Sequence, residues 1–207
     1  MKRTKSNRAW MREHVTDPFV KRAKVEGMRS RAAYKLDQLT ERDRLLRPGM
    51  TVIDLGAAPG GWSQIAARRV APGGRVIALD MLPMAELAGV TFIQGDFRED
   101  AVLARLEQVV GHAPVDLVVS DMSPNISGIA SADHARAMLL AELARNFALK
   151  HLKPRGNLLV KAFQGEGFEQ FVTALRRHFA QVVIRKPEAS RSRSSEVYVL
   201  GRRLKKA

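Results

Sequence analysis

Charged side chains stand at the ends of several apolar runs in this sequence. Asp80 ends the run 75–80, Asp121 follows the run 115–120, and Lys161 ends the run 157–161. A lysine at the end of a buried strand usually has a partner or a task, although a lysine whose ammonium group reaches solvent gives the same pattern. Open α/β folds bind ligands at the carboxyl ends of their strands. These positions therefore predict a site along one edge of a parallel sheet.

Residues 52–62 read Val-Ile-Asp-Leu-Gly-Ala-Ala-Pro-Gly-Gly-Trp, which predicts a buried strand, a tight turn and a helix. The small residues of the turn, Gly60 and Gly61 among them, leave room for a ligand against the backbone, so we expect a nucleotide-like cofactor there. The spacing is not Gly-x-Gly-x-x-Gly, and Pro59 lacks an N–H group, which argues against a nicotinamide-dependent oxidoreductase. Asp80 lies where doubly wound folds place an acid that accepts hydrogen bonds from ribose hydroxyls; a helix cap or turn residue is the alternative.

The composition favours a basic protein with a nucleic-acid partner. The 207 residues include 35 Lys and Arg against 21 Asp and Glu, a formal net charge of +14. The alternative is a charge that serves solubility alone. The sequence has no Cys, which excludes disulfides and thiolate metal sites and suits a reducing cytosol. We expect no metal site among the five His and no membrane span, hence a cytoplasmic protein.

The elements that would position these residues alternate along the chain. A basic arm over residues 1–17 precedes one domain over 18–207. Helices are predicted from Pro18 to Gly27, from an N-cap at Ser30 to Pro48, and over 63–70, 100–110, 132–152 and 168–179. Strands are predicted over 52–55, 75–80, 90–94, 115–120, 157–161, 181–185 and 196–200, and residues 125–131 form a loop that closes over substrate. This order predicts an α/β fold with a doubly wound, mostly parallel seven-stranded sheet, in which the last strand is antiparallel.

Several strings resemble the FtsJ/RrmJ family of S-adenosylmethionine-dependent ribose 2'-O-methyltransferases, and the similarity extends from near Trp10 to the last strand. They are Asp-Leu-Gly-Ala-Ala-Pro-Gly-Gly-Trp at 54–62, Arg-Ser-Arg-Ala-Ala-Tyr-Lys-Leu at 29–36, Asp-Met-Ser-Pro at 121–124, Ala-Phe-Gln-Gly-Glu-Gly at 162–167 and Ser-Arg-Ser-Ser-Glu-Val-Tyr at 192–198. The resemblance implies a class I methyltransferase (Rossmann-like) fold with the cofactor at the carboxyl ends of the first four strands.

The resemblance also implies roles for individual residues. The catalytic tetrad would be Lys35, Asp121, Lys161 and Glu196. S-adenosyl-L-methionine, without a metal, would be bound by Gly60, Gly61, Trp62, Asp80, Asp96 and Asp121, with Asp96 at the adenine amino group and Asp121 between the cofactor and the target hydroxyl. Apart from the resemblance, Lys35 reads as a solvated helix charge, Asp96 as a turn residue and Glu196 as a solvated acid at a strand end.

The substrate that the resemblance implies is a uridine ribose of 23S rRNA in the large ribosomal subunit of bacteria. A monomer would contact it through the basic arm, the N-terminal helices and the Arg/Ser-rich loop at 185–195. A cap- or tRNA-directed methyltransferase would use the same tetrad, although cap binding needs aromatic stacking surface and the chain has only two Trp. A binding module without catalysis would be expected to lack a tetrad residue.

The role of Lys161 in proton transfer has two versions. A ribose hydroxyl must lose its proton before or during attack on a methyl group. In one version Lys161 is a general base that loses its charge to burial and to the neighbouring Lys35. In the other it is a charged group that orients the hydroxyl and stabilises the developing alkoxide, which the nearby acids Asp121 and Glu196 favour.

Overall fold

The computed structural model describes residues 16–125 and 127–205. The predicted basic arm therefore lies outside the described residues, except for its last two. Asp17, which the sequence places in the arm, belongs to the folded part: it accepts a hydrogen bond from the N–H of Phe19 at 2.9 Å and caps α2 (Pro18–Val25). Its carboxylate also pairs with Arg31 at 3.0 Å.

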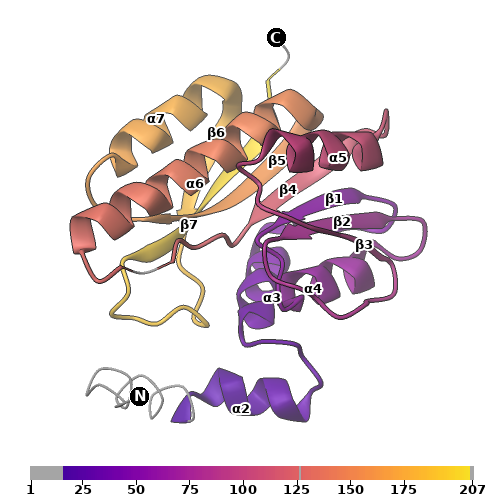
Figure 1. Cartoon of the computed structure of the whole chain (residues 1–207), viewed down its shortest axis with the longest axis horizontal. Helices are drawn as coiled ribbons and strands as arrows, with labels where there is room; N and C mark the ends of the chain where they lie inside the picture. The colour runs from indigo at the N-terminus through magenta and orange to yellow at the C-terminus, as the bar shows by residue number, and fades with distance from the viewer. Residues whose placement is uncertain (1–15, 126, 206–207) are drawn as a thin grey trace.

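Seven strands form one sheet in the order β3-β2-β1-β4-β5-β7-β6 (Figure 1). The strands are β1 (Thr51–Leu55), β2 (Arg75–Asp80), β3 (Val90–Gln94), β4 (Val115–Ser120), β5 (Leu152–Phe163), β6 (Phe179–Arg185) and β7 (Glu196–Leu204). All neighbours pair in parallel except β7, which is antiparallel to both β5 and β6. The predicted α/β sheet with one antiparallel strand is confirmed.

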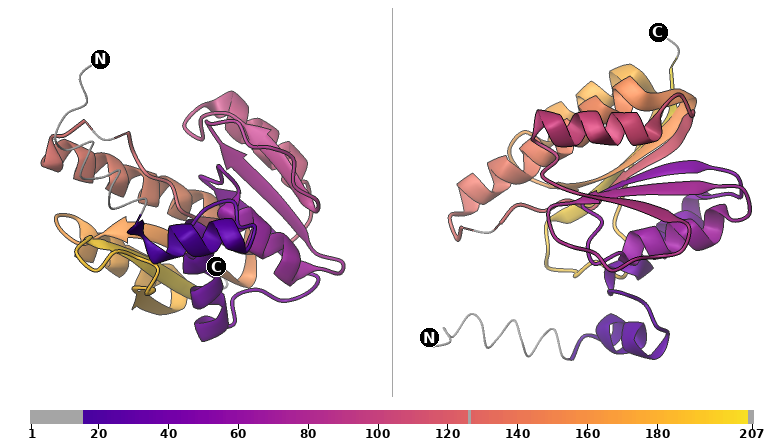
Figure 2. Two further views of the ribbon diagram at one scale, coloured as in Figure 1. Left: turned by 90° about the horizontal axis from the view of Figure 1, so that it is seen from below. Right: turned by 45° about the vertical axis from the view of Figure 1, so that its right-hand side comes forward.

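Helices cover both faces of this sheet, because alternate residues of each buried strand point to opposite sides. Ile53 and Leu55 of β1 pack in the cluster formed with α5 (Asp100–Val110), α6 (Ala130–His151) and α7 (Phe168–His178). Val52 packs in the other cluster, with α3 (Ala32–Asp43) and α4 (Gly61–Val70). Figure 2 shows these two helical layers with the sheet between them.

Several element boundaries differ from the prediction for physical reasons. β5 begins at Leu152, directly after α6, because the pairing of Val115 with Leu152 continues beyond an irregularity in the register. β7 continues to Leu204. Within this extension Gly201 packs against the ring of Phe179, and a Cβ on Gly201 would come within 2.8 Å of that ring. α3 begins at Ala32 without a side-chain cap, because Ser30 packs its hydroxyl against Gly61 instead. Among the described residues, no helix is both long and apolar enough to cross a membrane.

Candidate active site

The four predicted tetrad residues lie together although they come from four different elements. Lys35 is on α3, Asp121 follows β4, Lys161 is on β5 and Glu196 is the first residue of β7. The ammonium group of Lys35 lies 2.6 Å from Oε1 of Glu196. The ammonium group of Lys161 lies 3.2 Å from Oδ1 of Asp121 and donates to the backbone oxygen of Asp121 at 2.5 Å. The sheet brings the two pairs together, because Lys161 of β5 is opposite Tyr198 of β7.

Tyr198 joins the two ion pairs, and the sequence interpretation did not assign it a role. Its hydroxyl donates to Oδ1 of Asp121 at 2.7 Å and accepts from Lys35 at 3.1 Å. The signal that would have found it is its position two residues after Glu196, which puts both side chains on the same face of β7.

Burial and charge set the protonation states of this cluster. Burial raises the pKa of Asp121, but the charges of Lys161 and Lys35 and the hydrogen bond from Tyr198 outweigh it and lower that pKa below its ordinary value. Burial, together with the charges of Asp121 and Glu196, raises the pKa of Tyr198 well above its ordinary value. Asp121 is therefore an anion at neutral pH, and Tyr198 keeps the proton that it donates.

The glycine-rich turn lies beside this cluster, at the carboxyl end of β1. Its N–H groups are largely engaged within the protein: those of Gly56 and Ala57 donate to the backbone oxygen of Leu79, and that of Gly60 donates to the backbone oxygen of Ala57. The N–H of Ala58 donates to Oδ2 of Asp80 at 2.9 Å. The turn is thus held closed by its own hydrogen bonds and by Asp80.

The space beside the turn glycines is occupied by protein, which differs from the open crevice that the sequence suggested. A Cβ on Gly60 would come within 2.9 Å of the side chains of Arg29 and Met84, and a Cβ on Gly61 within 2.3 Å of the hydroxyl of Ser30. These glycines therefore allow the segment before α3 to pack closely against α4. Contact of Gly60 and Gly61 with a cofactor stays a prediction.

The side chain of Trp62 lies in the core, and its contact with a cofactor stays a prediction. Its side chain is 2% exposed and packs among the apolar residues between the sheet and α3, with its ring centroid 5.5 Å from that of Tyr198. Its indole N–H donates to the backbone oxygen of Ala32 at 2.8 Å. The indole is thus part of the core and supports Tyr198, and a cofactor could meet only the backbone of this residue.

The acids at the strand ends have different partners. Besides Ala58, Asp80 accepts from the N–H of Leu82 at 2.8 Å. Asp96 binds the guanidinium group of Arg98 at 2.6 Å, and this hydrogen bond, against a smaller effect of burial, lowers the pKa of Asp96. Their predicted contacts with ribose and adenine stay predictions.

Asp54, which the sequence interpretation placed in the motif without a role, is the most unusual acid of the site. It is fully buried, its Oδ2 accepts from the hydroxyl of Ser63 at 2.6 Å, and its Oδ1 has no hydrogen-bond partner among the described residues. Burial, with the charges of Asp121 and Asp80, raises the pKa of Asp54 to about 7 despite the hydrogen bond from Ser63. A positive charge bound nearby would favour the ionised form of this carboxyl group.

The loop after Asp121 is held by the start of α6. Asp133 accepts hydrogen bonds from the N–H of Ser127 at 2.8 Å and that of Gly128 at 3.0 Å. His134 contacts the backbone oxygen of Glu166 at 2.7 Å, which joins this region to the loop after β5. Closure of the loop over substrate stays a prediction. Among residues 16–125 and 127–205 there is no group of three or more potential metal ligands.

Comparison with known proteins finds relatives that match nearly the whole chain. The chain is 61% identical over 199 residues to the "Ribosomal RNA large subunit methyltransferase E" of Stenotrophomonas maltophilia (strain K279a), covering 96% of this chain and 95% of the relative. It is 61% identical over 201 residues to the protein of the same name in Nitrosospira multiformis, covering 97% of this chain and 98% of the relative.

Solved structures show the same fold. A ribosomal RNA methyltransferase from Plasmodium falciparum matches with a TM-score of 0.76 and 26% identity, over 85% of this chain and 98% of that one. An rRNA-methylase from Clostridium thermocellum matches with a TM-score of 0.55 and 18% identity, over 82% of this chain and 97% of that one, which is a likeness of fold alone. The sequence model of the FtsJ-like methyltransferases matches residues 28–204, and the chain belongs to this family.

Proposed function

We propose that the protein transfers a methyl group from S-adenosyl-L-methionine to the ribose 2'-hydroxyl of a uridine in 23S rRNA of the large ribosomal subunit. The observation that carries the proposal is the joined set of ion pairs, Lys35 with Glu196 and Lys161 with Asp121, beside the glycine-rich turn. The names of the two bacterial relatives support rRNA of the large subunit as the substrate.

The residues around the turn suit a cationic methyl donor. A cation bound at the turn would stabilise the charged form of the buried Asp54 carboxyl through its charge, without touching it. Asp80 ends β2 beside the turn, where an acid can accept hydrogen bonds from ribose hydroxyls. The donor would supply an electrophilic methyl group, and the protein would supply its orientation.

The acceptor side would hold the target hydroxyl in line with that methyl group. An ammonium group has three N–H bonds, and Asp121 accepts two from Lys161 among the described residues. We assign the third to the ribose oxygen, which makes Lys161 the orienting cation rather than the base. Its charge would stabilise the oxygen as the proton leaves to water, and Asp121 and Tyr198 would keep the lysine in place.

The RNA would lie on the basic side of the acceptor half. The loop between β6 and β7 exposes Lys186 and Arg193, and α2 carries Lys21, Arg22 and Lys24. Such side chains contact phosphates without reading sequence, so they would orient the RNA rather than select the nucleotide. The proposal includes a monomer that acts in the cytoplasm without a metal.

The test is transfer of a labelled methyl group by the purified protein to large ribosomal subunits, naked 23S rRNA and tRNA from a strain that lacks the modification. We expect 2'-O-methyluridine in 23S rRNA, identified by nuclease digestion and mass spectrometry. Label in tRNA or in a cap analogue would replace the proposed substrate by another RNA. Absence of label in every RNA would contradict the enzymatic assignment.

A further inference from the structure

The loop between β6 and β7, residues 186–195, has two different sides. Lys186, Glu188, Ser192, Arg193 and Ser195 are exposed, whereas Pro187, Ala189 and Ser190 are buried. The buried side packs on α3 and α2: Ala189 is fully buried in a cluster with Ala23 and Tyr34. The loop that would face RNA is thus docked through its other side on the helix that carries Lys35.

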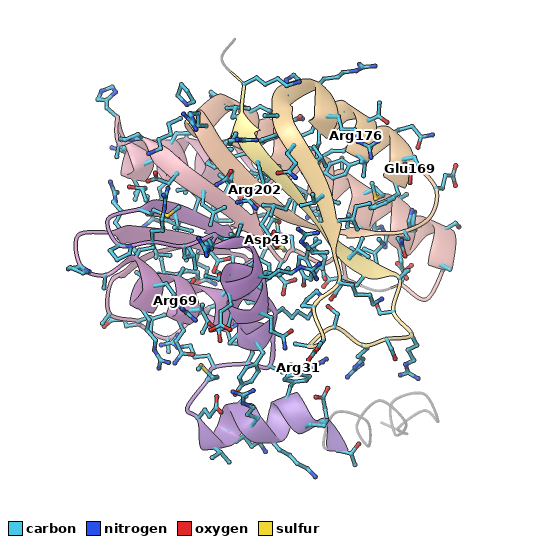
Figure 3. The ribbon with its side chains drawn as sticks, turned by 180° about the vertical axis from the view of Figure 1, so that it is seen from behind. Arg31, Asp43, Arg69, Glu169, Arg176 and Arg202 are labelled. Carbon is cyan, nitrogen blue, oxygen red and sulfur yellow. The ribbon has the colours of Figure 1, made fainter. Side chains whose placement is uncertain are left out.

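Both backbone polar groups of Ala189 are held by α3 and the residue before it. The N–H of Ala189 donates to Oε1 of Gln38 at 3.1 Å, and its backbone oxygen accepts from the guanidinium group of Arg31 at 2.5 Å. Arg31, Lys35 and Gln38 are spaced by four and three residues, so they lie on one helical face. The face of α3 that carries Lys35 therefore also holds the loop between β6 and β7. Figure 3 shows Arg31 beside this loop.

The residue after this anchor reaches the tetrad. The hydroxyl of Ser190, a residue that is 5% exposed, donates to Oε1 of Glu196 at 2.8 Å. Lys35 donates to the same oxygen at 2.6 Å, and the hydroxyl of Tyr198 lies 3.4 Å from it. Two donors, the hydroxyl of Ser190 and the ammonium group of Lys35, therefore hold this oxygen and restrict the rotation of the carboxylate, and so they also set the direction of its other oxygen.

We propose that Ser190 is a positioning residue for Glu196, held in place by the contact of Gln38 with Ala189. Ser190 acts by orienting the Glu196 carboxylate towards the acceptor ribose. The inference rests on the proposed function. The exposed side of the same loop carries Lys186 and Arg193, so RNA that binds there lies directly on the segment that orients Glu196.

The test compares Ser190→Ala, Ser190→Thr and the control Thr173→Ala, which removes an exposed hydroxyl from α7. Methyl transfer to large subunits is measured as kcat and as KM for each substrate, in the wild-type chain and in a Glu196→Gln background. We expect Ser190→Ala to lower kcat about tenfold, the effect of one hydrogen bond to a charged group, with KM for the methyl donor unchanged. Ser190→Thr and Thr173→Ala should keep kcat within about twofold of the wild type.

The Glu196→Gln background separates positioning from a general structural effect. If Ser190 acts through Glu196, adding Ser190→Ala to Glu196→Gln lowers kcat by less than about twofold. Gln38→Ala should lower kcat in the wild type and likewise add little in that background. The same tenfold loss in both backgrounds, or a loss confined to KM for RNA, would overturn the inference.

Failure of the proposed function is distinguishable from failure of this inference. If the wild-type chain methylates no RNA, the proposed function fails, and crystal structures of the wild type and Ser190→Ala then test the positioning directly. We expect the carboxylate of Glu196 to rotate away from Lys35 in the variant. An unchanged carboxylate would overturn the inference whether or not the protein is active.

Discussion

The acceptor half of the candidate site (Lys35, Asp121, Lys161, Glu196 and Tyr198) and the donor half (the turn 56–61 with Asp54, Asp80 and Asp96) are held together by different kinds of contact. In the acceptor half, side chains bond to one another across long stretches of sequence; Lys35 and Tyr198 are 163 residues apart. In the donor half the partners are closer in the sequence: Asp80 and Asp96 bond to residues two positions further on, and Asp80 also accepts from the N–H of Ala58, 22 positions earlier. Of the described residues in these two halves, Asp54 alone keeps a buried side-chain oxygen unpaired.

This difference indicates how each half meets its substrate. The acceptor half is satisfied before RNA arrives, so its geometry is set by the fold. Burying ion pairs contributes little net stability, which suggests that these pairs are kept for the arrangement they impose. The donor half holds one unfavourable group that a cation would relieve, so part of its arrangement depends on the ligand.

The largest expected effect tests whether the acceptor half works through a charge. Lys161→Ala should lower kcat about a thousandfold, because the target oxygen loses the group that orients it and stabilises its charge. Lys161→Arg, which keeps a cation, should retain clearly more activity than Lys161→Ala across pH 6 to 9. If the arginine variant is folded, binds the donor normally and is as inactive as the alanine variant, Lys161 is the base and our assignment is wrong.

The second prediction concerns the ion pair that holds the C-terminal end of α3. Asp43 is buried and binds Arg185 at 2.8 Å, and Arg202 beside it donates to its backbone oxygen at 3.2 Å (Figure 3). Asp43→Ala leaves Arg185 without its partner, so we expect the free energy of unfolding to fall by about 3 kcal/mol in urea titrations at pH 7. Glu41→Ala, on the same helix but exposed, is the matched control and should cost less than about 1 kcal/mol.

The pH dependence of this ion pair follows from the same contact. The hydrogen bond from Arg185 lowers the pKa of Asp43 against the effect of burial. The ionised Asp43 therefore stabilises the fold fully above the ordinary pKa of Asp. This stabilisation is lost as the pH falls through the lowered pKa that Asp43 has in the folded state. An Asp43→Ala variant that loses the same stability at pH 3 as at pH 7 would contradict this account.

The third prediction concerns the unpaired acid of the donor half. The pKa of Asp54 is raised to about 7 in the folded state. Between about pH 4 and 7, Asp54 is therefore protonated in the folded protein but ionised in the unfolded chain. The stability of the wild type relative to Asp54→Asn should therefore be highest below pH 4 and fall by about 2 kcal/mol between pH 5 and 7, then level off. Urea titrations over this range, repeated with saturating methyl donor, should show a smaller fall when the cation is bound. A difference independent of pH would mean that Asp54 is already paired.

The smallest effect tests Asp80. Asp80→Asn removes the charge and keeps an acceptor for only one of two N–H groups, because Ala58 donates to Oδ2 and Leu82 to Oδ1 of Asp80; we expect about a tenfold weaker affinity for the methyl donor with kcat unchanged. Equilibrium binding by calorimetry measures the affinity. A loss in kcat with unchanged affinity for the methyl donor would contradict the assignment of Asp80 to the donor half.

The two halves also differ in how far the sequence predicted them. The strands and the turn are local patterns, so the sheet, its antiparallel last strand and the strand-end acids were predicted from residue order. Lys161 was found because a charge at the end of a buried strand is unusual. Lys35 and Glu196 were assigned only through family resemblance, since a charged residue on a helix or at a strand end is ordinarily solvated.

What the sequence did not predict depends on packing between distant segments. Tyr198 and Ser190 contact tetrad residues because α3 lies across β7 and the loop before it. Trp62 follows the turn but faces the core, and Ser30 packs on Gly61 instead of capping α3. Neither periodicity nor capping preference contains that information, because both describe one element at a time.

The contact of Gly61 with Ser30 would set the separation between the two proposed substrates. The segment that leads into α3 lies directly on the first turn of α4, with no side chain from Gly61 between them, and Lys35 follows five residues after Ser30. The distance between these two segments therefore determines how far Lys35 lies from the glycine-rich turn. A methyl group added at Gly61 would act as a spacer, widening the gap that the transferred carbon must cross, and would be seen as a slower turnover with each substrate still bound.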